Sequence, residues 1–317
     1  MDIFDTRHTR RPDEGLFYRR DDPNDLRLGE VVCLGETGYA DAPVVILGCP
    51  QDEGVRRNRG RAGAALAPDE IRRCLYRLTT AGLGGLAIVD LGDTTIQPTL
   101  EETHALQQAI VEQVIRDGKR LISLGGGNDI SYPDCAALAS VAGDVLAFNM
   151  DAHFDVRTDA MRNSGTPYRQ LLEEGYIRPE RFYEMAYQPF ANSATYVRYL
   201  RERGVHAHSL ADLREQGLVK TFRSVLETPA AAIFWGFDLD AVRASDAPGV
   251  SAPTPVGLSG DELCQLAGLA GADPRTRIVE FCEVNPNYDI DQRTCRLTAV
   301  AIWHVLVSMG NDAWRIA

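Results

Sequence analysis

Acidic side chains and one histidine follow an apolar segment at a spacing that suits metal coordination. Asp151, His153 and Asp155 come directly after the apolar run 145–150, each two residues from the next. Residues two apart in an extended chain project to the same side, so these side chains can converge on one point. Acidic groups that follow a buried strand must be paired, hydrated or metal-bound, and the histidine between two aspartates favours a metal. A solvated acidic loop is the alternative interpretation.

A second pair of carboxylates strengthens the prediction of a metal site. Asp238 and Asp240 follow the run 231–237, which is apolar enough for a buried central strand. Together with Asp151 and Asp155 they supply four negative charges, which cannot gather at close range without cations. This carboxylate-rich set suits Mn²⁺ better than zinc. Two ions about 3.5–4 Å apart can share a water, lower its pKa toward ~7 and present hydroxide at neutral pH.

The elements that must position these residues are those of a parallel α/β sheet. From residue 43, short apolar runs alternate with longer helical patterns, which is typical of βαβ units. Ligands of such sheets gather at the carboxyl ends of the strands, and four of these ends carry reactive side chains: 125–129, 151–155, 238–240 and 283–286. The predicted strands are 44–47, 86–91, 120–124, 145–150, 181–185, 205–208, 231–236 and 277–282, and the predicted helices are 68–78, 101–117, 195–203, 260–270 and 295–308.

Composition indicates a globular protein that acts on small molecules. With 317 residues, 44% apolar and 25% charged, we expect a homo-oligomer with one catalytic domain (43–317) and an irregular N-terminal arm (1–42) that lies on the body of the domain or at a subunit contact. The net charge of −12 disfavours binding to nucleic acid or to an anionic membrane. No apolar run approaches the ~20 residues of a membrane span. The charged N-terminus and seven cysteines without a C-x-x-C pair predict a reducing, cytoplasmic location.

The order and spacing of these runs resemble the ureohydrolase family of arginases, agmatinases and formimidoylglutamases, over nearly the whole chain from about residue 43. The runs that carry the resemblance are 125–129, 149–155, 237–242 with 247–250 and 254–255, and 283–286. Segment 52–61, Arg157 and segment 164–170 are most similar to the formimidoylglutamase branch. The resemblance implies a three-layer α/β/α fold with a central, mostly parallel sheet of about eight strands. It also implies hydrolysis of N-formimidoyl-L-glutamate to glutamate and formamide, a late step of histidine breakdown.

The same resemblance assigns roles around two manganese ions. Asp151 and Asp238 would bridge the ions, Asp155 would complete one site, and His153 with Asp240 would complete the other. Asp155 is also predicted to be catalytic, as is Glu283, which would bind the cationic amidine. Independently of the family, a carboxylate at this edge suits the paired donors of a planar N–C–N group, although a loop or helix-capping role for Glu283 is the alternative.

One position departs from the family pattern. Asn128 stands where the family places a metal-binding histidine, and a neutral amide oxygen is a weak ligand, so we expect one weakened metal site. The neighbouring Asp129 is expected to cap the following helix instead. An enzyme with one weak site, a mononuclear enzyme that uses His153 and Asp240, and a catalytically weak relative retained for ligand binding all remain open.

Several side chains are candidates for binding the substrate. Arg57, in a basic run with Arg56, Arg59 and Arg61, could clamp a carboxylate or form surface ion pairs. Arg157 is the stronger candidate because it follows the metal run directly. Ser164 and Thr166 could donate to the substrate or cap the next helix. Tyr168 stands where arginases carry a proton-shuttling histidine, which argues against arginine and leaves another guanidino compound as the nearest rival substrate.

Overall fold

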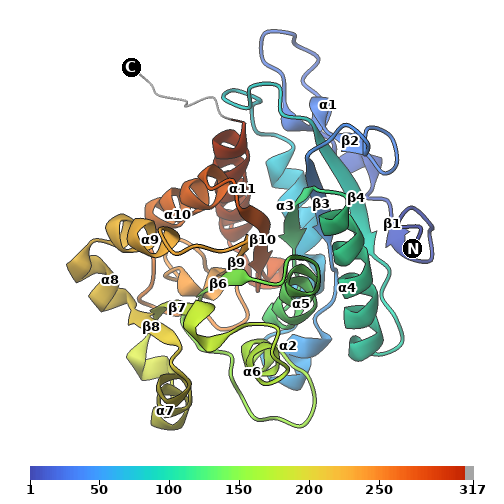
Figure 1. Cartoon of the computed structure of the whole chain (residues 1–317). Helices are drawn as coiled ribbons and strands as arrows, with labels where there is room; N and C mark the ends of the chain where they lie inside the picture. The colour runs from blue at the N-terminus through green and yellow to red at the C-terminus, as the bar shows by residue number, and fades with distance from the viewer. Residues whose placement is uncertain (311–317) are drawn as a thin grey trace.

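The structure, a computed structural model, describes residues 1–310 and contains one ten-stranded sheet. The strand order is β1-β4-β3-β5-β10-β9-β6-β7-β8, with β2 also paired to β4 (Figure 1). All neighbouring strands run parallel except β1 and β4. The strands are β1 (Thr9–Arg10), β2 (Cys33–Leu34), β3 (Val44–Gly48), β4 (Ile88–Thr94), β5 (Arg120–Leu124), β6 (Val145–Met150), β7 (Phe182–Tyr187), β8 (His206–Ser209), β9 (Ala232–Asp238) and β10 (Thr276–Cys282).

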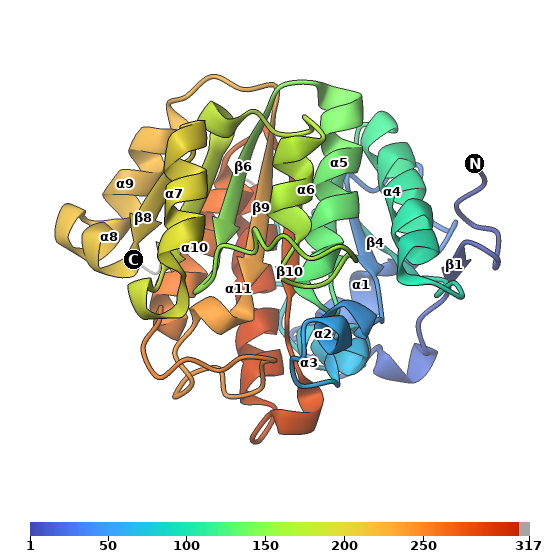
Figure 2. The same ribbon diagram turned by 90° about the horizontal axis from the view of Figure 1, so that it is seen from below.

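Helices cover both faces of the sheet, which gives the predicted three α/β/α layers (Figure 2). Successive side chains of β3 point to opposite faces, so Val44 and Ile46 pack in the core with α3, α10 and α11, whereas Val45 and Leu47 pack with α4, α5 and α6. The helices are α1 (Leu28–Val31), α2 (Glu53–Arg57), α3 (Ala67–Leu75), α4 (Leu100–Arg116), α5 (Ser131–Ala142), α6 (Pro167–Glu173), α7 (Ala194–Arg203), α8 (Leu210–Gln216), α9 (Leu218–Leu226), α10 (Gly260–Ala272) and α11 (Arg293–Met309). No helix of residues 1–310 is long and apolar enough to cross a membrane.

The N-terminal arm differs from its prediction as an irregular segment. Two short strands, β1 and β2, pair with β4, so the sheet has ten strands rather than about eight. Strands of two residues are too short to give a periodic pattern in the sequence. Pairing with the arm covers an edge of the sheet that would otherwise present unpaired backbone groups.

Helix α5 has no counterpart among the predicted helices. Its first nine residues are all buried, because it lies between the sheet and neighbouring helices, and it therefore lacks the polar face on which an amphipathic pattern depends. By contrast, β5 and β6 have the predicted bounds, since each is a short and mostly apolar run.

Candidate metal centre

Four adjacent strands in the middle of the sheet carry the predicted site. Strands β5, β10, β9 and β6 are neighbours in that order, although they lie far apart along the chain. The parallel register pairs Leu124 with Phe281, Cys282 with Asp238, and Phe237 with Met150. The carboxyl ends of these strands therefore meet at one edge, and each is followed by one of the four reactive runs.

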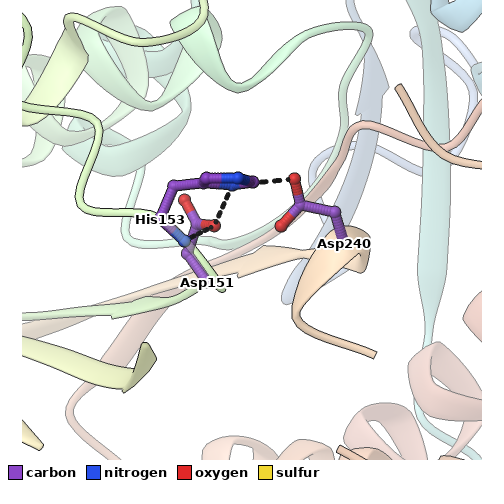
Figure 3. Close-up of side chains that lie close together, drawn as sticks. All are labelled: Asp151, His153 and Asp240. Carbon is purple, nitrogen blue, oxygen red and sulfur yellow. Dashed lines mark hydrogen bonds and ion pairs between the residues drawn. The ribbon is translucent and has the colours of Figure 1, made fainter. Parts of the chain in front are cut away.

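Five of the six predicted metal ligands meet at this edge in two groups. Asp151, His153 and Asp240 each offer a ligand atom within 4.8 Å of the other two, and Asp151, Asp155 and Asp238 do the same. Asp151 belongs to both groups, which is the position expected of a carboxylate shared between two ions. Figure 3 shows Asp151, His153 and Asp240 pointing toward one another.

Local backbone geometry fixes these side chains. The backbone N–H of His153 donates to Asp151 Oδ1 at 2.6 Å, and that of Asp240 donates to Asp238 Oδ1 at 2.8 Å. Such short turns lock the direction of an aspartate just after a strand. His153 Nδ1 lies 3.1 Å from Asp240 Oδ2 and 3.3 Å from Asp151 Oδ1 (Figure 3). The histidine therefore joins the two motifs through its side chain.

The electrostatics of the cluster favour a cation. Burial, followed by repulsion from Asp240, raises the pKa of Asp151 to about 7, and burial likewise raises the pKa values of Asp155 and Asp238 well above their ordinary range. The nearby Asp240 carboxylate, against the effect of burial, raises the pKa of His153 to about 12. In the described residues none of these aspartates forms an ion pair with lysine or arginine, and Asp240 Oδ1 is buried without a hydrogen-bond partner. Hard, oxygen-preferring ions fit this donor set.

This electrostatic arrangement predicts how metal stabilisation depends on pH. The pKa of Asp151 in the fold, about 7, exceeds its ordinary 3.8, so its protonation stabilises the metal-free protein at low pH and that contribution is lost as the pH rises through 7. In the metal-free protein His153 stays protonated across this range, and it must release that proton to bind a metal. We therefore expect added Mn²⁺ to raise the melting temperature more at about pH 8 than at about pH 6, as measured by thermal unfolding with and without chelator. An equal or larger increase at the lower pH would contradict competition between protons and metal.

Asn128 presents its amide nitrogen, not its oxygen, to the cluster. Its Nδ2 donates to Asp155 Oδ2 at 2.7 Å and lies 3.3 Å from Asp151 Oδ2. Its Oδ1 accepts hydrogen bonds from Ser131 Oγ at 2.7 Å and Cys282 Sγ at 3.2 Å. In their ionised form the carboxylates can only accept, while the hydroxyl and thiol can donate, so this network orients the amide. Asn128 must rotate before its oxygen can bind a metal.

The loop before Asn128 requires glycine at one position. A Cβ on Gly126 would lie 1.6 Å from the backbone oxygen of Gln51, so only glycine allows this close approach.

The prediction that Asp129 caps the next helix is wrong, because its Oδ2 accepts from Gln51 Nε2 at 2.6 Å and lies 2.7 Å from His104 Nε2. This buried carboxylate is therefore directed away from the metal cluster.

A cavity of about 270 Å³ opens beside the cluster of candidate metal ligands, and His153, Asp155, Asp238 and Asp240 form part of its wall. Glu283 lines it, with its backbone in the left-handed region (φ 62°) and its Oε1 accepting from the backbone N–H of Asn128 at 2.8 Å. Burial raises the pKa of Glu283 to about 8. Arg157 and Ser164 also line the cavity, whereas Tyr168 is buried behind Asn128 and donates to Ser131 Oγ at 3.1 Å.

Two predicted substrate-binding residues do not line this cavity. Arg57 lies in the hollow next to the cavity, where Glu53 at 3.1 Å and Glu101 at 2.6 Å neutralise its guanidinium. Thr166 is buried, and its hydroxyl exchanges hydrogen bonds with the backbone of Asn163. The prediction that Arg57 and Thr166 bind substrate therefore has no support from this geometry, since both side chains make structural contacts.

Comparison with known sequences identifies the family. The sequence model of the arginase family matches residues 42–308, which is most of the chain. The chain belongs to the arginase family. Among its relatives, the formimidoylglutamase of Paraburkholderia xenovorans is 32% identical over 284 residues, covering 84% of this chain and 88% of the relative.

Solved structures agree with membership of the arginase family. A formiminoglutamase from Trypanosoma cruzi, crystallised with Mn²⁺, superposes with a TM-score of 0.86 at 34% identity and covers 91% of this chain and 99% of its own. The formimidoylglutamase from Bacillus subtilis gives a TM-score of 0.85 at 28% identity, covering 94% of this chain and 98% of its own.

Other residues that line the cavity of this arginase-family fold were not singled out from the sequence. They come from separate loops and helix ends, and their residue types are common on protein surfaces, so no local pattern marks them. Among them are Asn58, Asn192, Tyr196 and Ser251. Asn58 Nδ2 donates to Ser164 Oγ at 3.0 Å and thereby joins two walls of the cavity.

Proposed function

We propose that this chain is a manganese-dependent formimidoylglutamase, which hydrolyses the amidine C–N bond of N-formimidoyl-L-glutamate to give L-glutamate and formamide. The observation that carries the proposal is the largely buried group of four aspartates and one histidine from adjacent strand ends, without a lysine or arginine partner in the described residues. Formimidoylglutamase relatives that cover most of the chain support the choice of reaction.

Asp151, Asp155, Asp238, Asp240 and His153 would hold the metal ions. Bound Mn²⁺ lowers the pKa of a coordinated water and so provides a nucleophile at neutral pH. Asp151, which belongs to both ligand groups, and Asp238 would be the carboxylates shared between the ions, Asp155 would complete one site, and His153 with Asp240 would complete the other. Asn128 serves the site through its hydrogen bond to Asp155 and weakens metal binding at that position, because it offers no imidazole.

Glu283 and the cavity walls would bind the substrate. In its ionised form Glu283 is a hydrogen-bond acceptor for the two N–H groups of a cationic amidine. Burial raises the pKa of Glu283 and so disfavours its ionised form. A cationic amidine bound beside it would favour ionisation of the carboxyl group. Arg157 is free to attract a substrate carboxylate, and Ser164 can donate a hydrogen bond to it.

Product analysis tests this function. Protein purified without chelator and supplied with Mn²⁺ is expected to release formamide from N-formimidoyl-L-glutamate, and chelation of the metal is expected to abolish that release. Agmatine, guanidino acids and arginine serve as comparison substrates, with urea as the product to be measured. Urea release without formamide would make the chain a guanidino hydrolase, and ligand-induced stabilisation without turnover would make it a binding protein.

The proposal includes a small-molecule substrate in a cytoplasmic homo-oligomer that does not bind nucleic acid. All seven cysteines are free thiols, which suits a reducing compartment. The net charge of −12 opposes binding to nucleic acid. Light scattering would report the oligomeric state.

A further inference from the structure

Arg59 occupies a backbone conformation that usually favours glycine. It follows the end of α2 in the left-handed region, with φ 62°. Its N–H donates to the backbone oxygen of Arg56 at 3.0 Å, and the N–H of Gly60 donates to that of Val55 at 2.9 Å, which is a common way to end a helix. Glycine is the residue that such a position most often carries. Strained residues of this kind gather at functional sites, so the arginine calls for an explanation.

The other arginines of the basic run are already engaged. Arg56 pairs with Asp52 at 2.9 Å, and Arg57 pairs with Glu53 and Glu101. Arg61 donates to the backbone oxygen of Val250 and lies over the ring of Tyr288, 4.2 Å from its centroid.

Arg59, by contrast, is exposed and makes no side-chain hydrogen bond or ion pair within residues 1–310, and the same holds for Arg157. Both line the cavity beside the metal cluster and the hollow next to it. Gly165 lets the Arg157 side chain pass close to the backbone, since a Cβ there would lie 2.5 Å from Arg157 Cδ. The guanidinium groups of Arg59 and Arg157 therefore both lie at the entrance of this cavity, without a partner in residues 1–310.

The charge of the cavity explains why two guanidiniums would be needed there. Its inner walls carry the carboxyl groups of Asp155, Asp238, Asp240 and Glu283, which would hold the metal ions and the amidine and supply no cation for a substrate carboxylate. N-formimidoyl-L-glutamate has one cationic amidine and two carboxylates. The amidine suits the acidic interior, whereas each carboxylate requires a cation nearer to the solvent.

We propose that Arg59 is a specificity-determining residue that binds one of the two substrate carboxylates, with Arg157 at the other. The inference rests on the proposed function and deepens it. Because guanidinium and carboxylate form strong charge-assisted hydrogen bonds, the contact selects a dicarboxylate over amidines that lack one acidic group.

The test compares substrates that differ by one carboxylate. Arg59→Ala is expected to raise KM for N-formimidoyl-L-glutamate about tenfold or more, with kcat and manganese content nearly unchanged. N-formimidoyl-4-aminobutyrate lacks the α-carboxylate and N-formimidoyl-norvaline lacks the side-chain carboxylate. One of these two compounds lacks the carboxylate that Arg59 binds. For that compound, wild type and Arg59→Ala should have similar KM values. The KM of Arg59→Lys for N-formimidoyl-L-glutamate should lie between those of wild type and Arg59→Ala.

Matched measurements separate failure of this inference from failure of the proposed function. Arg223→Ala, an exposed arginine on α9 away from the cavity, should behave as wild type. Calorimetry of L-glutamate binding to the manganese-loaded protein needs no turnover, and Arg59→Ala should weaken that binding. An unchanged KM for the dicarboxylate, or an equal rise for all three amidines, would overturn the role of Arg59 while leaving the function intact. If the wild type cleaves no amidine, the proposed function fails, and unaltered glutamate binding by the variant would then reject Arg59 as well.

Discussion

Asp238→Asn is expected to remove most of the bound manganese and to lower amidine hydrolysis by at least about 100-fold. Changes around metal ligands typically cost ~10–100-fold, and loss of a bridging carboxylate should cost more. Asp238 is buried at the end of β9 and belongs to one of the two ligand groups. Metal analysis of the purified variant and the rate of formamide release measure the two effects.

The same substitution makes a second prediction that separates function from folding. Burial and repulsion from neighbouring carboxylates raise the pKa of Asp238 well above its ordinary range, so its ionised form destabilises the metal-free protein. Metal-free Asp238→Asn should therefore unfold at a temperature no lower than metal-free wild type. Asp261→Asn, an exposed aspartate at the start of α10, is the matched control and should keep metal and activity. Full manganese occupancy in Asp238→Asn would refute the ligand assignment.

Asn128→His is expected to tighten manganese binding by about tenfold or more, with unchanged or higher activity. The amide nitrogen of Asn128 points to Asp155 at 2.7 Å and offers a proton where an imidazole could offer a lone pair. Neutral imidazole is a better ligand for divalent transition metals than an amide. Titration of the metal-free protein with Mn²⁺, followed by calorimetry and by activity, measures the affinity and its consequence.

A second substitution at Asn128 isolates the reason for that result. Asn128→Ala removes the donor to Asp155 without adding a ligand, so its manganese affinity should not exceed that of wild type. If alanine tightened binding as much as histidine, the gain would come from relief of the amide contact rather than from coordination. A drop in manganese occupancy in Asn128→His would contradict the position of Asn128 beside the metal.

Local spacing in the sequence was enough to predict which acidic side chains gather with His153 in one cluster. Asp151, His153 and Asp155 follow a short buried strand, and alternation along an extended chain is a property of the backbone alone. The apolar runs that became β5 and β6 were also recognisable, because a fully buried parallel strand needs nothing but apolar residues over its length.

Only the tertiary structure decided which partner each polar side chain has. Arg57 and Arg59 belong to the same short basic run, yet Arg57 meets Glu101, 44 positions further on, while Arg59 is left at the cavity mouth. Asn128 is likewise oriented by Cys282, 154 positions away. These two contacts depend on the pairing of β3 with β4 and of β5 with β10, which brings together segments whose separation along the chain carries no local pattern.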